Sequence, residues 1–232
     1  MHLKENQVPR ENVVIIGAPC TGMIDNHKLE KAGSERNILG AEPDGNNLNV
    51  TLDSGETLVV KTADILLGDC RTCRYPTPVL YDILAGEPVE ASGNDLFADI
   101  REIEGKSPDE RWALFVEEMK KCTRCYACRN ACPLCYCEEC FAEQTRPRWI
   151  GITDDLSDVI FYQMGRMFHM AGRCIDCGAC EAACPNGVRL RLFTKKIVKD
   201  ALELFNYTAG LSIEEDTPLA TFKPDDPNEF VM

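Results

Sequence analysis

The sequence CTRCYACRNACP at residues 122–133 recurs in pattern as CIDCGACEAACP at residues 174–185. Both runs follow the spacing C-x2-C-x2-C-x3-C-P, in which three thiolates from one turn bind one iron-sulfur cluster and the fourth binds a second cluster. Proline cannot continue a helix, so Pro133 and Pro185 turn the chain away after the last cysteine of each run. The two runs therefore predict one module with two clusters, and each cluster needs both runs.

This spacing assigns four cysteines to each cluster, and both clusters are expected to be of the 4Fe-4S type. A pair of zinc sites is disfavoured, because zinc is usually bound by two C-x2-C pairs without a closing proline. A disulfide framework is disfavoured as well, because disulfides are typical of secreted domains. We expect cluster 1 to be held by Cys122, Cys125, Cys128 and Cys184, and cluster 2 by Cys174, Cys177, Cys180 and Cys132.

The chain has 232 residues, a net charge of −13 and 14 cysteines. The acidic balance argues against a nucleic-acid partner, because phosphates would be repelled. The N-terminal residues lack the apolar segment of a secretion signal, and no apolar run approaches the roughly 20 residues that a membrane span requires. We therefore expect a cytoplasmic protein. So many cysteines in that compartment indicate metal ligation, and oxygen-sensitive clusters indicate an anaerobic setting.

The predicted fold class is α+β. Residues 1–95 are expected to form a small N-terminal α/β part with a β-hairpin and a loop that carries Cys70 and Cys73. Residues 96–206 are expected to form a mainly helical dicluster ferredoxin domain. Residues 207–232 are interpreted as an extended acidic tail.

In the N-terminal part, residues 13–16 (VVII) predict a short buried strand that ends in the loop Gly17–Gly22. Residues 25–47 are charged and rich in Gly and Asn, so an irregular connection is expected there. Residues 49–52 and 56–60 predict a β-hairpin with its turn at Gly55.

The second half predicts three helices. Ser107 and Glu110 form a capping box before a helix that runs into Cys122. A second helix, capped by Asp155 or Ser157, is expected to bury one face and to lead into Cys174. The expected buried face of this second helix consists of Ile160, Met164, Met167 and Phe168. A third helix is expected to be capped by Asn186.

Six cysteines remain after the two clusters are assigned, and they make a candidate third metal site. Residues 135–140 (CYCEEC) allow at most three ligands from one loop, and the C-x2-C at residues 70–73 is interpreted as the source of the rest. A third 4Fe-4S cluster, a structural zinc and unligated thiols all stay open as interpretations. The lone histidines His27 and His169 are interpreted as structural residues. The six cysteines are Cys20, Cys70, Cys73, Cys135, Cys137 and Cys140.

The segment between the two runs, residues 133–173, is longer than a compact bacterial ferredoxin requires. With a helix before each run, the module resembles the α-helical ferredoxin modules of heterodisulfide reductase and of succinate dehydrogenase iron-sulfur subunits. This likeness concerns the fold and implies electron relay without naming a substrate.

Three segments carry a more specific resemblance: IIGAPCTGMID at residues 15–25, the Cys70–Cys73 loop with the Tyr81-Asp82 and Gly86-Glu87 pairs that follow it, and CRNACPLCYC at residues 128–137. With them the chain resembles the beta-subunit family of deazaflavin (coenzyme F420)-dependent hydrogenases and formate dehydrogenases. More narrowly, it resembles the dicluster ferredoxin relatives that accompany heterodisulfide-reductase-like complexes in anaerobes. The resemblance covers most of the chain, although the family's N-terminal part, which helps to form the flavin site, is expected to be absent.

This resemblance implies a non-catalytic subunit that passes single electrons through two or three 4Fe-4S clusters to other subunits of a redox complex. The partner would be a hydrogenase, a formate dehydrogenase or a heterodisulfide-reductase-like assembly. The alternative is part of a flavin-dependent catalytic subunit that binds FAD near Gly17–Gly22.

Charged residues near the two runs lead to a prediction about potentials. Positive charge favours the more negative reduced cluster, so cluster 1 is expected to have the higher potential unless solvent screens these charges. The positive residues of the first run are Lys120, Lys121, Arg124 and Arg129, and the negative residues of the second are Asp176 and Glu181.

Overall fold

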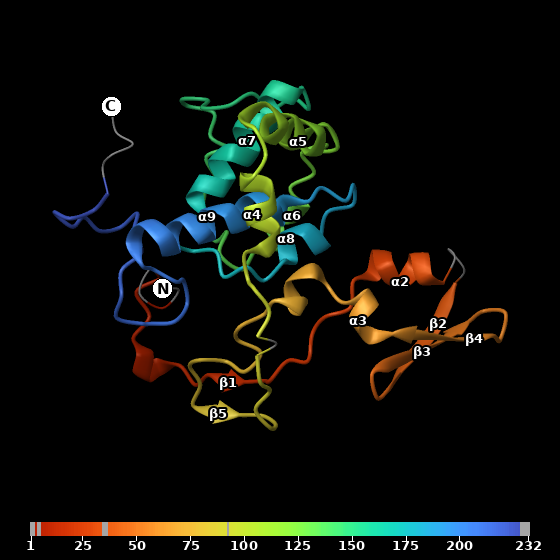
Figure 1. Ribbon diagram of the computed structural model, residues 1–232. Helices are drawn as coiled ribbons and strands as arrows, with labels where there is room; N and C mark the ends of the chain where they lie inside the picture. Colours follow the sequence, from red (N-terminus) through yellow and green to blue (C-terminus); the bar gives the residue numbers. More distant parts are fainter. Residues whose placement is uncertain (1–2, 4–5, 34–36, 92, 228–232) are drawn as a thin grey trace. The chain divides into compact units, whose positions relative to one another are not determined.

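The computed structural model describes residue 3 and residues 6–33, 37–91 and 93–227. The chain divides into two compact units (Figure 1). We call Val14–Leu96 the β unit, and Met1–Val13 together with Phe97–Met232 the helical unit. Helix and strand are both present, which confirms the α+β class. The division at residues 95/96 and 206/207 stays a prediction.

A three-stranded antiparallel sheet forms the core of the β unit, in the order β2 (Ile38–Asp44), β3 (Asn47–Leu52) and β4 (Thr57–Lys61). Side chains alternate across a strand, so Leu48, Val50 and Leu52 all lie on the buried face of β3. They pack against Ile65 of the short helix α3 (Thr62–Ile65). The hairpin is confirmed, and Gly55 in its turn has a φ of +83°, which favours glycine.

The predicted irregular connection over residues 25–47 is wrong. It contains the helix α2 (Asn26–Ala32) and the strand β2. Asp25 caps α2 by accepting hydrogen bonds from the backbone N–H groups of His27 and Lys28. The carboxylate cap and the pairing of β2 with β3 outweigh the weak local preferences of this polar segment.

The predicted buried strand over residues 13–16 is wrong as well. Only Ile16–Gly17 forms a strand, β1, which pairs in parallel with β5 (Ile83–Leu84). Val14 is 69% exposed and Ile16 is 66% exposed. The apolar run therefore lies at the surface of the β unit. The expected loop Gly17–Gly22 does follow β1, and Cys70 lies on a short 3-10 helix, η2 (Gly68–Arg71).

The helical unit begins with the 3-10 helix η1 (Arg10–Asn12) and continues from Phe97. Three longer helices make its core, and the helix pairs α5–α7 and α7–α9 are in contact (Figure 1). Met119, Val159, Met167, Val188 and Leu190 are buried together with two of the cluster cysteines. Its helices are α4 (Ala98–Glu104), α5 (Pro108–Lys120), α6 (Ala127–Asn130), α7 (Leu156–His169), α8 (Ala179–Ala182) and α9 (Leu190–Phe205).

Helix α5 starts at the predicted capping box. The Ser107 side chain accepts a hydrogen bond from the Glu110 backbone N–H, and the Glu110 carboxylate accepts one from the Ser107 backbone N–H. Near its end, the buried Glu118 accepts hydrogen bonds from the Arg189 backbone N–H at 3.0 Å and from Arg189 Nε at 2.8 Å. Glu118 thereby joins α5 to the segment that precedes α9.

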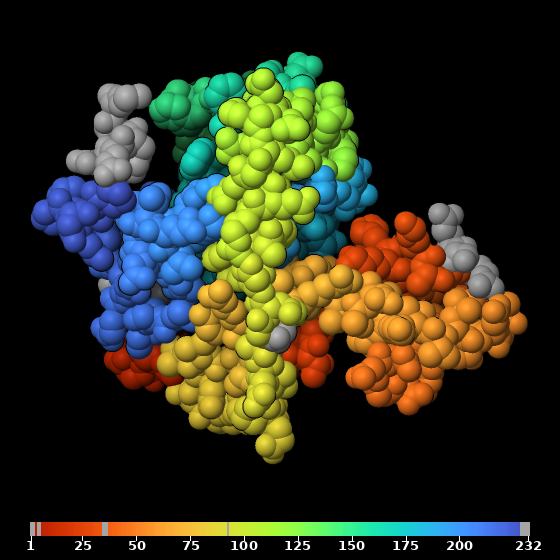
Figure 2. Space-filling view, viewed as in Figure 1, coloured from red at the N-terminus to blue at the C-terminus, as the bar shows by residue number. Residues whose placement is uncertain are grey.

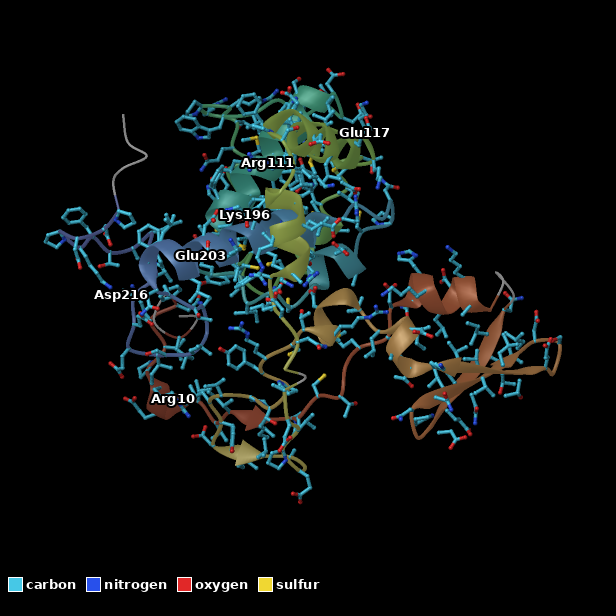
Figure 3. The ribbon with its side chains drawn as sticks, in the orientation of Figure 1. Arg10, Arg111, Glu117, Lys196, Glu203 and Asp216 are labelled. Carbon is cyan, nitrogen blue, oxygen red and sulfur yellow. The ribbon has the colours of Figure 1, made fainter. Side chains whose placement is uncertain are left out.

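Helix α4 lies along α9, and Figure 2 shows its yellow-green surface against the blue of α9. Ion pairs hold them together, among them one between Arg191 Nη1 and Asp99 Oδ2 at 3.1 Å and one between Lys199 Nζ and Glu104 Oε2 at 2.8 Å. Lys196, labelled in Figure 3, also reaches Glu104 at 3.2 Å. The sequence analysis did not predict helix α4.

Helix α9 does not begin at Asn186. It starts at Leu190, because the chain between Pro185 and Arg189 is held outside the helix by the contacts of Glu118. The Asn186 side chain instead donates a hydrogen bond to Thr123 Oγ1 at 3.1 Å. Asn186 therefore links the two cysteine runs.

The chain after α9 has no helix or strand among its described residues, up to residue 227. Tyr207 and Thr217 are nevertheless buried. Gly172 has a φ of +68°, and a Cβ atom there would lie 2.6 Å from Pro218 Cδ, so this stretch packs closely on the end of α7. Within the described residues, no helix is long and apolar enough to cross a membrane.

Candidate metal centres

The two cysteine runs adopt the same backbone conformation. Arg124 and Asp176, between the first and second cysteines, have positive φ angles of 53° and 55°. Tyr126 and Gly178, between the second and third cysteines, have positive φ angles of 61° and 72° and precede the short helices α6 and α8. These left-handed residues fold each run into a tight turn. Such conformations are costly away from glycine, and they occur mostly where surrounding structure or function requires them.

The first turn surrounds a small cavity in the helical unit. Cys122, Cys125 and Cys128 of the first run line it together with Cys184 of the second run. The Cys122 thiol accepts hydrogen bonds from the Arg124 backbone N–H at 3.5 Å and from Gln163 Nε2 at 3.3 Å. We call this space cavity 1.

The second turn surrounds another small cavity, which we call cavity 2. Cys174, Cys177 and Cys180 line it together with Cys132 of the first run. The Asp176 backbone N–H donates to the Cys174 thiol at 3.4 Å, at the position equivalent to Arg124. The structure thus brings together the same two groups of four cysteines that the spacing had grouped.

The chemistry of these cavities fits an iron-sulfur cluster. Burial raises the pKa of Cys174 to about 12 and that of Cys180 to about 11. It also raises the pKa of Cys128. Buried thiolates are therefore unfavourable unless a cation stabilises them, and an iron centre held by four thiolates provides that charge.

Helix α7 contributes polar side chains that the sequence analysis missed. The predicted buried face was Ile160, Met164, Met167 and Phe168, but Phe168 is 60% exposed. The structure instead buries Tyr162, Gln163 and Arg166 against the cysteines. These polar residues do not belong to an apolar periodicity, so the sequence pattern does not predict that they are buried. Only the packing of α7 beside both cysteine turns shows their position.

Arg166 is 3% exposed and lies beside cysteines of both groups, Cys128 of the first and Cys180 of the second. Its Nη2 donates to the Cys128 carbonyl at 3.0 Å, and the side chain also lines cavity 2. In the described part of the chain, its Nε and Nη1 have no hydrogen-bond partner. A buried cation is costly without a counter-charge, and the nearest source of negative charge is the thiolates of both groups.

Charged residues that the sequence analysis singled out near the two cysteine runs form ion pairs within the protein. Asp176 forms ion pairs with Lys195 Nζ at 3.3 Å and with Arg191 Nε at 3.2 Å. Near cavity 1, Lys121 pairs with Glu118 and Arg129 pairs with Glu143, both at 2.9 Å. The net field at each cavity is therefore smaller than a count of charges suggests. The predicted order of potentials stays a prediction.

Three of the remaining cysteines belong to the β unit. The Gly22 backbone N–H donates to the Cys20 thiol at 3.4 Å, and the Met23 backbone N–H donates to the Cys70 thiol at 3.2 Å. A Cβ atom on Gly22 would lie 3.5 Å from Cys70 Cβ, so the loop after β1 packs on the loop of Cys70. Cys73 follows in the same segment. Hydrogen bonds from backbone N–H to sulfur also occur at both cavities of the helical unit.

The other three, Cys135, Cys137 and Cys140, line a larger cavity of the helical unit, of about 590 Å³. Across the described residues, no three Cys, His, Asp or Glu side chains are placed to hold a single metal ion. A cluster has a different requirement, because each of its ligands binds a different iron. The prediction that one metal joins these cysteines to Cys70 and Cys73 stays a prediction.

Residues 118–188 match the family model of the 4Fe-4S dicluster domain. This segment is thus similar to dicluster domains. It contains both cysteine runs and all eight cysteines that line cavities 1 and 2.

Two relatives extend the similarity beyond the dicluster domain. The chain is 24% identical to the F420-dependent formate dehydrogenase subunit beta of Methanocaldococcus jannaschii, over 90% of this chain and 69% of that subunit. It is 23% identical to the F420-dependent formate dehydrogenase 1 subunit beta of Methanococcus maripaludis, over 72% of this chain and 58% of that subunit. The chain thus spans only part of each relative. Together with the dicluster domain, these matches support an iron-sulfur electron-transfer subunit of an oxidoreductase.

Proposed function

We propose that the chain relays single electrons between other subunits of an anaerobic oxidoreductase complex. One observation carries this proposal: two cavities are each lined by three cysteines of one run and one cysteine of the other. Bound in these cavities, two 4Fe-4S clusters would supply one-electron carriers. Arg166 links the two centres, because its side chain lines cavity 2 and donates a hydrogen bond to the carbonyl of Cys128, which lines cavity 1.

The chain's own residues position and tune the two centres. Cys122, Cys125, Cys128 and Cys184 would hold cluster 1, and Cys174, Cys177, Cys180 and Cys132 would hold cluster 2. Donors to sulfur stabilise the electron-rich reduced state, so Gln163 and the backbone N–H groups raise the potential. No residue is assigned a catalytic role. The burial of α7 against the cysteines excludes water from the space between them.

The partners are proposed from the relatives, both of which are named as formate dehydrogenase subunits. A formate dehydrogenase, a hydrogenase or a heterodisulfide-reductase-like assembly would each provide an electron donor and an acceptor. The acidic chain argues against nucleic acid, and a cytoplasmic location fits oxygen-sensitive centres.

We also propose that the remaining cysteines bind metal. In the β unit, Cys20 and Cys70 accept backbone hydrogen bonds from neighbouring residues, and Cys73 follows on the same loop. Three thiols on two packed loops suit an iron-sulfur cluster or a structural zinc.

A second function is favoured by the names of the relatives, which include coenzyme F420. In that case the chain would be part of a flavin-dependent subunit that binds FAD beside the loop Gly17–Gly22. A flavin spectrum from anaerobically purified protein would support this function, and its absence would leave the relay.

The ligand sets can be tested by double substitutions followed by iron and acid-labile sulfide analysis. Cys122→Ser/Cys184→Ser changes one proposed cluster and should remove about four irons per chain. Cys122→Ser/Cys132→Ser changes both and should remove up to about eight. The reverse result would show that each run holds its own cluster, and an iron-free wild-type protein would refute the relay.

A further inference from the structure

A third cavity of the helical unit adjoins cavity 2 and has a lining of its own. Leu134, Arg166 and Met170 line both. Beyond that shared wall, the larger space is lined by Cys135, Cys137 and Cys140. We call it cavity 3. It is a separate space within reach of the second proposed cluster.

All three cysteines of the segment CYCEEC reach this one cavity. Cys135 follows Cys132 closely, and its backbone N–H donates to the Cys132 carbonyl at 3.1 Å. Cys132 lines cavity 2 whereas Cys135 lines cavity 3, and their side chains are hydrogen-bonded to each other, so the two thiols meet where the cavities adjoin. The segment therefore carries one ligand of cluster 2 and three further thiols for another centre.

A fourth ligand comes from helix α7. His169, the last residue of α7, lines cavity 3 as well. Its ring packs edge-on against Phe141, with centroids 4.6 Å apart, and Phe141 follows Cys140 directly. The sequence analysis interpreted His169 as structural, but a neutral imidazole is a common metal ligand. Three thiols and one imidazole complete a set of four.

The charges around cavity 3 fit an anionic centre. Arg129, Arg166 and Arg173 line it. Arg129 lies against both Glu143 and Cys140. Arg166 is buried, and its Nε and Nη1 find no partner in the described part of the chain. Three thiolates bring negative charge to this group of cations, which offsets the cost of burying Arg166.

From these residues we propose that cavity 3 binds an additional iron-sulfur cluster through Cys135, Cys137, Cys140 and His169. The proposal rests on the relay function and adds a third carrier beside cluster 2. A single zinc is the competing occupant of three cysteines and a histidine. The cluster is favoured, because these side chains do not converge on one ion and the cavity of about 590 Å³ is far wider than an ion requires.

The test starts from a chain in which the other free cysteines are removed, Cys20→Ser/Cys70→Ser/Cys73→Ser. Purified anaerobically, this parent chain should hold about twelve irons and twelve sulfides, and adding Cys137→Ser/Cys140→Ser should leave about eight of each. A parent with eight irons, or a loss of zinc in place of iron, would overturn the proposal. Fewer than eight irons in the final variant would instead count against the two-cluster relay.

The histidine ligand has its own readout. Pulsed EPR of the reduced parent chain should show nitrogen coupling to one cluster, and His169→Cys should remove this coupling while keeping about twelve irons. Unchanged coupling in His169→Cys would exclude His169 as a ligand. His27→Cys, on α2 of the β unit, is the matched control and should leave the nitrogen coupling in place.

Discussion

At the scale of single residues, Arg166 is the side chain whose role depends most on the cofactors. It is buried, it donates to the Cys128 carbonyl, and it lines cavity 2. The other charges near the cysteines have protein partners, such as Lys195 for Asp176. A buried guanidinium beside two groups of thiolates stabilises added negative charge, so it should favour the reduced state of both clusters.

Arg166→Gln should therefore shift the midpoint potentials of the clusters to more negative values. We expect a change of about tenfold in the reduction equilibrium, which is about 59 mV for a one-electron couple. The measurement is a redox titration followed by EPR, on a variant that keeps its full iron content. Lys120→Gln is the matched control, because Lys120 is exposed and paired with Glu117 at 2.6 Å. Equal potentials in wild type and Arg166→Gln would remove the electrostatic role.

At the scale of helices, the connections between elements are made by a few buried polar contacts. Glu118 is 2% exposed and ties α5 to Arg189, just before α9. Burial acts to raise the pKa of Glu118, but hydrogen bonds from Arg189 and Lys121 outweigh it, so its pKa is lowered. Because the carboxyl pKa is lowered, this contact stabilises the fold at pH values above the ordinary pKa of a glutamate. The stabilisation is lost as the pH falls through the lowered pKa.

Glu118→Gln should lower the stability of the helical unit at pH 7 by about 1–3 kcal/mol, because it weakens a buried charge-assisted contact. The difference from wild type should shrink as the pH falls through the lowered pKa of Glu118, where the wild-type carboxylate becomes protonated. Thermal unfolding followed by circular dichroism at several pH values measures both effects. Glu117→Gln is the control on the same helix. Its side chain, labelled in Figure 3, is 66% exposed, so little change is expected.

At the scale of the whole molecule, the two units depend differently on metal. Helices α6 and α8 have only four residues each and are flanked by cluster cysteines, so they have little stability of their own. The core of the β2–β4 sheet is formed by Leu48, Val50, Leu52 and Ile65, and contains no cysteine. Metal binding should therefore contribute folding free energy mainly to the helical unit.

Removing iron with a chelator under reducing conditions should unfold much of the helical unit and leave the sheet intact. Hydrogen exchange should show faster exchange of amides in α7 and α9, with unchanged protection in β3. Restoring iron and sulfide should restore the protection in α7. Equal protection of α7 with and without iron would show that the clusters do not support the fold.

Several local features followed from the sequence alone. The Ser107 capping box and the turn at Gly55 were predicted, because each depends on residues within a few positions. The grouping of the eight cluster cysteines was predicted for a similar reason, since the spacing of each run shapes one turn. The predicted strand at residues 13–16 and the irregular segment at residues 25–47 were wrong, because short apolar or polar runs do not show what they pair with.

The sequence by itself thus determined an α+β protein with two cysteine turns, because covalent spacing and local backbone geometry act over a few residues. The tertiary structure decided which side of α7 faces the thiols, and so brought Gln163 and Arg166 beside them. In the tertiary structure Cys132 lines cavity 2, whereas Cys135 lines cavity 3. His169 lines cavity 3 as well. These arrangements bring together residues that are dozens of positions apart in the sequence. They depend on how whole helices pack, and no local sequence pattern predicts that packing.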